Sequence, residues 1–260
     1  MHLRRDLKIM AVPRAPFGPS RPVRPRFWGL RLAMILTLAV FGTAASADIV
    51  SARFTDPTTR YAHGVLGDAI EWGTLELRLS NGARRRIILP ESRVFEDLAP
   101  RLIDVDGDNA PEAIVVESSQ TAGARLAIYG AAGLLAATPF IGQRNRWLAP
   151  IGAADLDGDG LIEIAYVDRP HLAKTLRVWR FQNNALTQIA THNNLTNHRI
   201  GQDFITGGIR DCGQGPEMVV VSGDWSQILA VHLNKQGQTA TTALGDYTGP
   251  ESVTQLMRCQ

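Results

Sequence analysis

The stretch 102–116 reads LIDVDGDNAPEAIVV, and two later stretches repeat its pattern: AADLDGDGLIEIAYV at 153–167 and GIRDCGQGPEMVVV at 208–221. Each has an apolar lead-in, a polar loop that begins with aspartate, a glutamate and then an apolar run. The leading residues, Asp104, Asp155 and Asp211, are 51 and 56 residues apart. A repeat of about fifty residues is typical of one four-stranded blade of a β-propeller.

Short apolar or alternating runs, separated by Gly, Asp, Asn and Pro, continue on both sides of these stretches. Many short runs of this kind at regular spacing predict an all-β protein. A second strand and a looser third strand follow each apolar run of the repeat. The strands predicted in this way are 74–79, 86–89, 113–116, 125–129, 134–141, 162–167, 175–181, 185–190, 218–221, 228–233 and 239–244.

The repeat length predicts the number of blades. One period before the first repeat lies the stretch 63–68, which has no acidic pattern but precedes a predicted strand. Four blades therefore fit, and five are the alternative if the two ends, 48–60 and 246–260, make another unit. A propeller closes by pairing its terminal strands within one blade, which removes exposed sheet edges. We therefore expect 49–54 to join the last blade.

The first two repeats place carboxylates at positions 1, 3, 5 and 9 of a loop. Calcium takes six to eight oxygen ligands, and alternate acids on a tight loop can surround one ion together with the carbonyl at position 7. A solvated turn without an ion is the alternative, but four crowded anions repel one another. We predict two Ca²⁺ sites, formed by Asp104, Asp106, Asp108, Ala110 and Glu112 and by Asp155, Asp157, Asp159, Leu161 and Glu163.

An EF-hand also begins D-x-D-x-D, but it requires glutamate at position 12 and helices on both sides. Position 12 is Val115 in one loop and Tyr166 in the other. The loops resemble instead the FG-GAP or VCBS repeats, also found in the integrin α-chain propeller, which carry D-x-D-x-D-G-x-x-D/E before a strand. This resemblance implies a propeller with calcium bound between the first two strands of a blade. It does not extend to metal binding in the third repeat, where Gly213 and Gly215 replace acids.

The chain has two cysteines, Cys212 and Cys259. In an oxidising compartment such a pair usually forms a disulfide, and two buried free thiols are the alternative. Cys212 lies in the acid-poor loop of the third repeat, so we expect the disulfide to hold that loop where no calcium can. A reducing agent should then loosen the last blade, and a chelator the two middle blades.

The N-terminal segment is typical of a secretory signal peptide: a basic stretch, an apolar run at 32–41 and small residues that end Ala45-Ser46-Ala47. We predict that 1–47 is removed by cleavage after Ala47, which leaves 48–260 as a single propeller domain in the periplasm or outside the cell. An uncleaved anchor is the alternative, although the run is shorter than the roughly 20 residues of a membrane span. We expect no stable membrane span after cleavage.

Removal of this segment changes the charge of the protein. The segment holds eight of the 27 basic residues and one of the 25 acidic residues, so the mature chain carries 19 bases and 24 acids. Nucleic-acid binding requires a basic face. The mildly acidic mature chain therefore excludes a nucleic-acid partner.

Loops near the predicted blade junctions carry arginine, histidine and tryptophan, which could meet on one face and bind an anionic or sugar-like ligand. The alternative is that the tryptophans pack between blades and the arginines are solvated. The predicted ligand face consists of Arg144, Arg146, Trp147, Arg169, His171, His198 and Arg199.

The sequence favours a binding or scaffold module for a protein or carbohydrate ligand. No nucleophile elbow, H-E-x-x-H motif or glycine-rich phosphate loop is present. An enzyme that acts on a polysaccharide, as a lyase or hydrolase, is the second hypothesis, and a structural protein of the cell envelope is the third. Acid and histidine side chains in one pocket would favour the enzyme, and an aromatic or arginine-rich face would favour binding.

Overall fold

The structure is a computed structural model that describes residues 18 and 47–259. Most of the predicted signal peptide therefore lies outside the described residues. Residues 47–259 belong to one compact unit. No helix in the described part of the chain is both long enough and apolar enough to cross a membrane.

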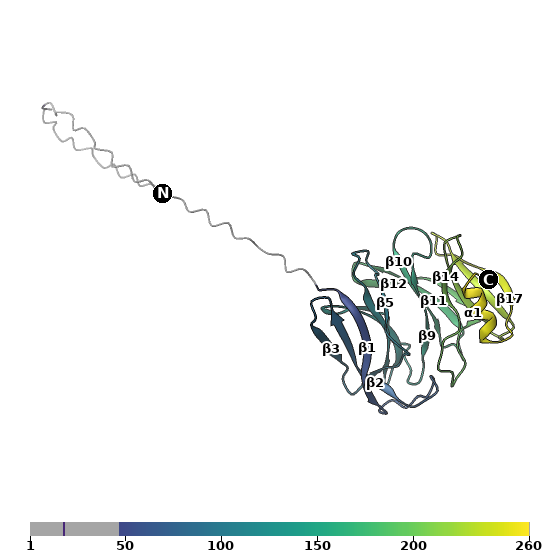
Figure 1. Ribbon diagram of the computed structural model, residues 1–260, viewed down its shortest axis with the longest axis horizontal. Coiled ribbons are helices and arrows are strands. Elements are labelled where there is room, and N and C mark those ends of the chain that lie inside the picture. Colours follow the sequence, from purple (N-terminus) through teal and green to yellow (C-terminus); the bar gives the residue numbers. More distant parts are fainter. Residues whose placement is uncertain (1–17, 19–46, 260) are drawn as a thin grey trace, which may run out of the picture. The chain divides into compact units, whose positions relative to one another are not determined.

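The compact unit contains three antiparallel sheets and one short helix, which confirms the all-β prediction (Figure 1). Each strand predicted from an apolar run overlaps an observed strand. The first sheet consists of β1 (Ile49–Thr58), β2 (Glu71–Leu79), β3 (Arg84–Ile88), β4 (Arg93–Phe95), β5 (Arg101–Ile103), β6 (Glu112–Ser119), β7 (Gly123–Gly130) and β8 (Gly133–Ala137). The second consists of β9 (Leu148–Ala154), β10 (Ile162–Asp168), β11 (Thr175–Gln182) and β12 (Ala185–Asn193). The third consists of β13 (Leu195–Thr196), β14 (Gly208–Asp211), β15 (Pro216–Ser222), β16 (Gln227–Leu233) and β17 (Thr239–Asp246).

The second sheet shows the repeating unit in its simplest form, with β9, β10, β11 and β12 paired in chain order. β5 to β8 in the first sheet and β14 to β17 in the third follow the same order. The sheets are neighbours in space as in sequence, because β7 lies against β9 and β9 lies against β14. Each aspartate-led loop therefore connects the first two strands of its unit.

The first strand of the unit is continuous only in the second sheet, where β9 pairs with β10 along its whole length. In the other sheets two short strands share this role: β4 and β5 both pair with β6, and β13 and β14 both pair with β15. The segments 96–100 and 197–207 separate these short strands. Ile200 of the second segment lines the cavity described below, and Glu96 of the first is hydrogen-bonded to a histidine of that cavity.

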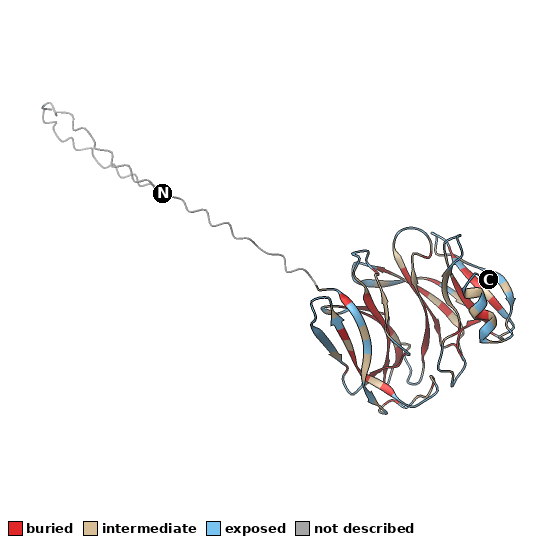
Figure 2. Ribbon diagram, in the orientation of Figure 1, coloured by how far each residue is buried: buried red, intermediate tan, exposed pale blue. Residues whose placement is uncertain are grey.

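The second strand of each unit is buried on both faces, which explains its continuous apolar run. In β6, Ile114 and Val116 join the core between the first and second sheets, whereas Ala113 and Val115 pack with Leu75 of β2. β2 thus covers the other face of β6 even though β4 links the two strands into one sheet. Figure 2 shows the buried residues concentrated on these central strands.

The predicted closure by terminal strands is wrong. β1 pairs with β2, not with a strand of the last sheet. The ring of Phe54 stacks on Phe95 at 5.3 Å between centroids, and Ile49 is buried beside Leu75 and Leu77, so the apolar side chains of β1 find partners within the first sheet. The described residues form three sheets rather than four or five separate blades, because β4 joins β1 to β3 to the sheet of the first repeat.

The C-terminal segment contains a helix that the sequence analysis did not predict, α1 (Pro250–Met257). Val253 of this helix is buried against Val219, Val221 and Ile228 of the third sheet. The predicted disulfide Cys212–Cys259 is present, with 5.7 Å between its Cα atoms. It fixes the chain after α1 to the loop after β14.

Candidate metal loops and ligand cavity

The two predicted metal loops occupy equivalent turns. The first joins β5 to β6, and the second joins β9 to β10. Position 6 has a left-handed backbone in both, with φ of 69° at Asn109 and 91° at Gly160. Asparagine and glycine are the residues that adopt this conformation most readily, as the sequence analysis expected.

Backbone N–H groups orient the carboxylates of the first loop. Asp104 accepts hydrogen bonds from the N–H groups of Gly107 at 2.7 Å and Asn109 at 2.9 Å. Glu112, which is 6% exposed, accepts one from Val105 at 3.1 Å. The loop is therefore closed on itself by its first and last acids.

The second loop repeats this arrangement. Asp155 accepts hydrogen bonds from the N–H groups of Asp159 and Gly160, both at 3.0 Å. Glu163 is fully buried and accepts one from Leu156 at 2.9 Å. The second loop is therefore also closed on itself by its first and last acids.

The position-7 residues, predicted to supply main-chain oxygens, bond to the loops through their nitrogens. Ala110 donates its N–H to Asp108 at 2.8 Å, and Leu161 donates its N–H to Asp159 at 2.9 Å. These contacts tie position 7 to position 5 in both loops.

The spacing of the acids in the first loop fits calcium. Asp104, Asp106 and Asp108 each offer a carboxylate oxygen, and these oxygens lie within 4.8 Å of one another. Two oxygens that each bind one calcium ion at about 2.3–2.6 Å can be at most about 5 Å apart. Among the described residues, no Lys, Arg or His nitrogen lies within 4.0 Å of these three carboxylates or of Glu112. Burial and repulsion from the aspartates raise the pKa of Glu112 to about 7.

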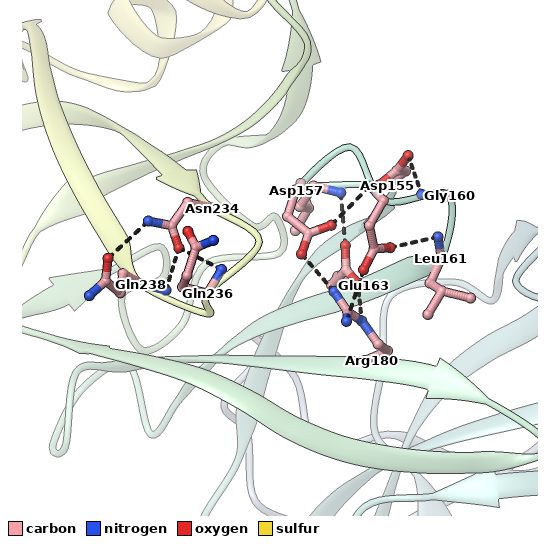
Figure 3. A network of polar contacts seen from close by, with 11 residues as sticks. Asp155, Asp157, Gly160, Leu161, Glu163, Arg180, Asn234, Gln236 and Gln238 are labelled. Carbon is pink, nitrogen blue, oxygen red and sulfur yellow. Dashed lines mark hydrogen bonds and ion pairs between the residues drawn. The ribbon is translucent and has the colours of Figure 1, made fainter.

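The second loop also gathers three acids, since oxygens of Asp155, Asp157 and Glu163 lie within 4.8 Å of one another. Here, however, a cation of the chain itself is present. Arg180 of β11 forms ion pairs with Asp157, Asp159 and Glu163 at 2.7, 3.0 and 2.8 Å (Figure 3). Burial raises the pKa of Glu163, and the ion pair with Arg180 opposes this effect.

The third loop is built differently. Asp211 accepts hydrogen bonds from the N–H groups of Gly213 at 2.7 Å and Gly215 at 3.1 Å. Glu217 pairs with Arg210 at 2.6 Å. The acids of this loop are therefore held by glycine N–H groups and by an arginine.

A cavity of about 380 Å³ lies at the opposite end of β9 and β10 from the second metal loop. Its walls come from the loop before β9, the loop after β10, the loop between β1 and β2, and the segment 197–207. Four predicted ligand-face residues line it: Arg146, Trp147, Arg169 and His171.

One wall contains His171, which contacts a second histidine buried behind it. His171 Nε2 lies 3.0 Å from Nδ1 of His198, which is fully buried and packs edge-on against the ring of Trp147. Burial and the neighbouring His198 lower the pKa of His171 to about 4, and burial also lowers the pKa of His198. His171 is therefore a neutral hydrogen-bonding group at pH 7.

His63 also lines the cavity, and its Nδ1 lies 2.6 Å from Glu96 Oε1. Glu96 is fully buried, its second oxygen accepts a hydrogen bond from Ser118, and its main-chain carbonyl accepts one from Trp147 Nε1 at 2.9 Å. Burial raises the pKa of Glu96, and the hydrogen bond from His63 opposes the rise. Glu96 thus fixes the orientation of His63 from behind the cavity.

The two arginines of the cavity differ in their partners. Arg169 makes a two-pronged ion pair with buried Asp168, at 2.8 and 3.0 Å. Arg146 has no carboxylate of the described residues within 4.0 Å. Arg146 is therefore the cation that a ligand in the cavity can neutralise.

Three other predicted ligand-face residues do not line the cavity: buried His198, which contacts His171, and two arginines. The guanidinium of Arg144 lies 5.7 Å from the centre of the Tyr61 ring. The guanidinium of Arg199 lies 4.3 Å from the centre of the Trp225 ring, in the third sheet. The predicted ligand face is therefore not one continuous surface. Some of its residues surround one cavity, whereas Arg144 and Arg199 lie over aromatic rings outside it.

His63 and Glu96 were not among the site residues predicted from the sequence. They lie 33 residues apart, and the structure brings them together because β4 ends beside the start of β2, next to the loop that holds His63. The stretch 63–68 was noticed only as a repeat without acids. A histidine at its start, in a loop with two glycines, was the available signal.

Together, the repeated four-stranded units and their acidic turns define a class of repeat β proteins with loops suited to metal binding. Residues 104–166, which span both acidic loops, match the family model of the FG-GAP-like repeat. This match confirms, for that part of the chain, the resemblance that its motifs indicated. No curated protein matches the chain.

Proposed function

We propose that the protein is an exported, propeller-like module that binds a carboxylate-bearing ligand, of the carbohydrate or protein class, in the cavity beside Arg146. Two features of the cavity carry this proposal: Arg146 has no carboxylate of residues 47–259 within 4.0 Å, and the rim of the cavity is apolar and exposed. Leu172 and Ile200, both cavity residues, are 64% and 71% exposed. Exposed apolar side chains around polar groups mark interaction sites.

The cavity suits a ligand with an anionic group and a neutral polar part. Arg146 would bind the carboxylate, because a guanidinium offers several N–H donors in one plane. His171, neutral at pH 7, can exchange hydrogen bonds with hydroxyl groups, and Trp147 is held rigid by its bond to Glu96. Acidic oligosaccharides carry both kinds of group, which makes them the first probes to test.

Arg146→Gln is expected to weaken the binding of an acidic oligosaccharide at least about 10-fold, because a charge-assisted hydrogen bond contributes roughly 1.5–3 kcal/mol. Titration calorimetry with a panel of acidic and neutral oligosaccharides measures the effect. Arg144→Gln is the matched control, because it removes the same charge from the same loop outside the cavity. Equal losses in the two variants, or no binding of any acidic probe by the wild type, would contradict this site.

The disulfide supports export, because such bonds persist in oxidising compartments. We further propose that calcium binds the acidic loop of the first repeat and that its role is structural. Asp104, Asp106, Asp108 and Glu112 would hold the ion, which would neutralise their mutual repulsion at the turn between β5 and β6. In this proposal the ion stabilises the scaffold, and the ligand binds at the other end of the units.

A second candidate function, a polysaccharide lyase or hydrolase, is favoured by one observation. His63 lies in the cavity with a buried carboxylate on its Nδ1, an arrangement that orients a histidine for proton transfer. Prolonged incubation with each oligosaccharide that binds, followed by chromatography, tests this activity. Shortened chains that disappear with His63→Asn would establish an enzyme, and unchanged chains would leave the binding module as the function.

A further inference from the structure

The guanidinium of Arg180 is inserted among the acids of the second loop. Its three nitrogens contact three different carboxylates: Nε meets Glu163, Nη2 meets Asp157 and Nη1 meets Asp159. All three acids belong to the predicted calcium ligands. Figure 3 shows Asp157 and Glu163 directed toward the arginine head group.

The register of the sheets explains why the second repeat alone has this contact. Glu163 of β10 lies opposite Arg180 of β11. In the first repeat the register of β6 and β7 runs from Ala113 opposite Tyr129, so the position opposite Glu112 is Gly130. Glycine has no side chain to enter the loop.

In the third repeat the equivalent glutamate, Glu217, has a different set of partners. Glu217 pairs with Arg210 of β14 at 2.6 Å, and His232 of β16 lies 3.3 Å from its other oxygen. Arg210 also donates to the main-chain carbonyl of Leu256 in α1. Among the residues that the structure describes, the glutamate that ends the loop thus meets no basic group in the first repeat, one arginine in the second, and an arginine with a histidine in the third.

We propose that Arg180 takes the place of the divalent ion in the second loop, so that the protein binds one calcium ion, in the first loop, rather than two. Three carboxylates already direct an oxygen to the guanidinium, which removes those oxygens from a metal's ligand set. An arginine stays charged at any physiological pH, so Arg180 cannot become neutral to admit a calcium ion. A calcium ion would face this positive charge across the shared carboxylates. The second loop should therefore bind calcium at least about 100-fold more weakly than the first.

Calcium titration of the full chain, followed by calorimetry and by equilibrium dialysis, tests the proposal. We expect one tightly bound ion for the wild type and two for Arg180→Gln. The matched control is Arg177→Gln on the same strand, which removes the same charge but contacts Asp168 and Gln188 instead. This control should still bind one ion. Two tight ions in the wild type, or no additional ion in Arg180→Gln, would overturn the proposal.

The inference rests on the calcium site proposed above for the first loop, and further variants separate the two. Asp106→Asn should abolish binding in the wild-type background but leave one ion in the Arg180→Gln background. If the wild type binds no calcium and Arg180→Gln binds one, the role of Arg180 stands and the first site fails. If Arg180→Gln does not fold without calcium, its thermal unfolding in added calcium provides the readout, and a variant that calcium does not restore counts against the proposal.

Discussion

Replacing both Cys212 and Cys259 with serine is expected to lower the free energy of unfolding by about 4 kcal/mol. The disulfide closes a loop with a sequence separation of 47 residues, and the entropy that such a link removes from the unfolded chain corresponds to about this value. The effect should be local to the third sheet, because the bond ties the chain after α1 to the turn between β14 and β15. Val253 is the one buried side chain of α1, and apart from it the helix is held by the partly buried Leu256 and Met257 and by the bond from Arg210 to the Leu256 carbonyl.

Urea unfolding measures the size of this effect, and hydrogen exchange measures its location. Amides of α1 and of β14 to β17 should exchange faster in the double variant, while those of β6 and β10 should change least. A reduced wild type should behave like the variant. An unchanged free energy of unfolding, or faster exchange spread evenly over the three sheets, would show that the bond does not hold the third loop.

A second large effect is expected at Glu71, the first residue of β2. Its side chain is 2% exposed, and among the described residues no basic nitrogen lies within 4.0 Å of its carboxylate. Burial, reinforced by the neighbouring acids Glu96, Asp68 and Asp97, raises its pKa from 4.5 to about 9. The folded protein therefore keeps this proton at neutral pH, whereas the unfolded chain loses it above about pH 4.5.

The sign of the pH dependence follows from this difference. Stability from the protonated Glu71 is fully present below pH 4.5 and is lost as the pH rises toward 9. The Glu71→Gln variant has no proton to lose at this position, so it does not undergo this loss of stability. The free energy of unfolding of the variant, relative to that of the wild type, should therefore rise by about 1.4 kcal/mol per pH unit. Between pH 5 and 8 the gain is on the order of 4 kcal/mol.

Urea unfolding of both proteins across this pH range measures the gain. Glu91→Gln is the matched control, because the Glu91 side chain is 91% exposed. The difference between this control and the wild type should stay flat with pH. A flat difference for Glu71→Gln as well would show that Glu71 is ionised in the folded protein.

Strand positions were predictable because each central strand has an uninterrupted apolar run between polar turns. The pairing of β1 was not, because its alternating pattern fits any sheet with a free edge. Phe54 settles the choice through its contact with Phe95, which lies 41 residues away in sequence. The helix α1 escaped prediction because its eight residues include a single buried side chain.

The residues of the candidate sites were likewise predictable where they lie close together in sequence, and not where strand pairing brings them together. The acidic loops were predictable because all their ligands lie within nine residues of one another. Arg180 was not recognised, since its relation to Glu163 depends on the register between two strands. His63 and Glu96 were missed for the same reason: their contact depends on how β1, β2 and β4 are arranged, and neither has a local motif.

The most direct test of the calcium proposal is urea unfolding of the wild type and of Asp106→Asn, each in a chelator and in calcium at about 100 times the dissociation constant. An ion that binds only the folded protein stabilises it by about 2.7 kcal/mol at that concentration. We predict this gain for the wild type and none for Asp106→Asn. Calcium that stabilises neither protein, or both equally, would contradict the claim that an ion balances the acids of the first loop.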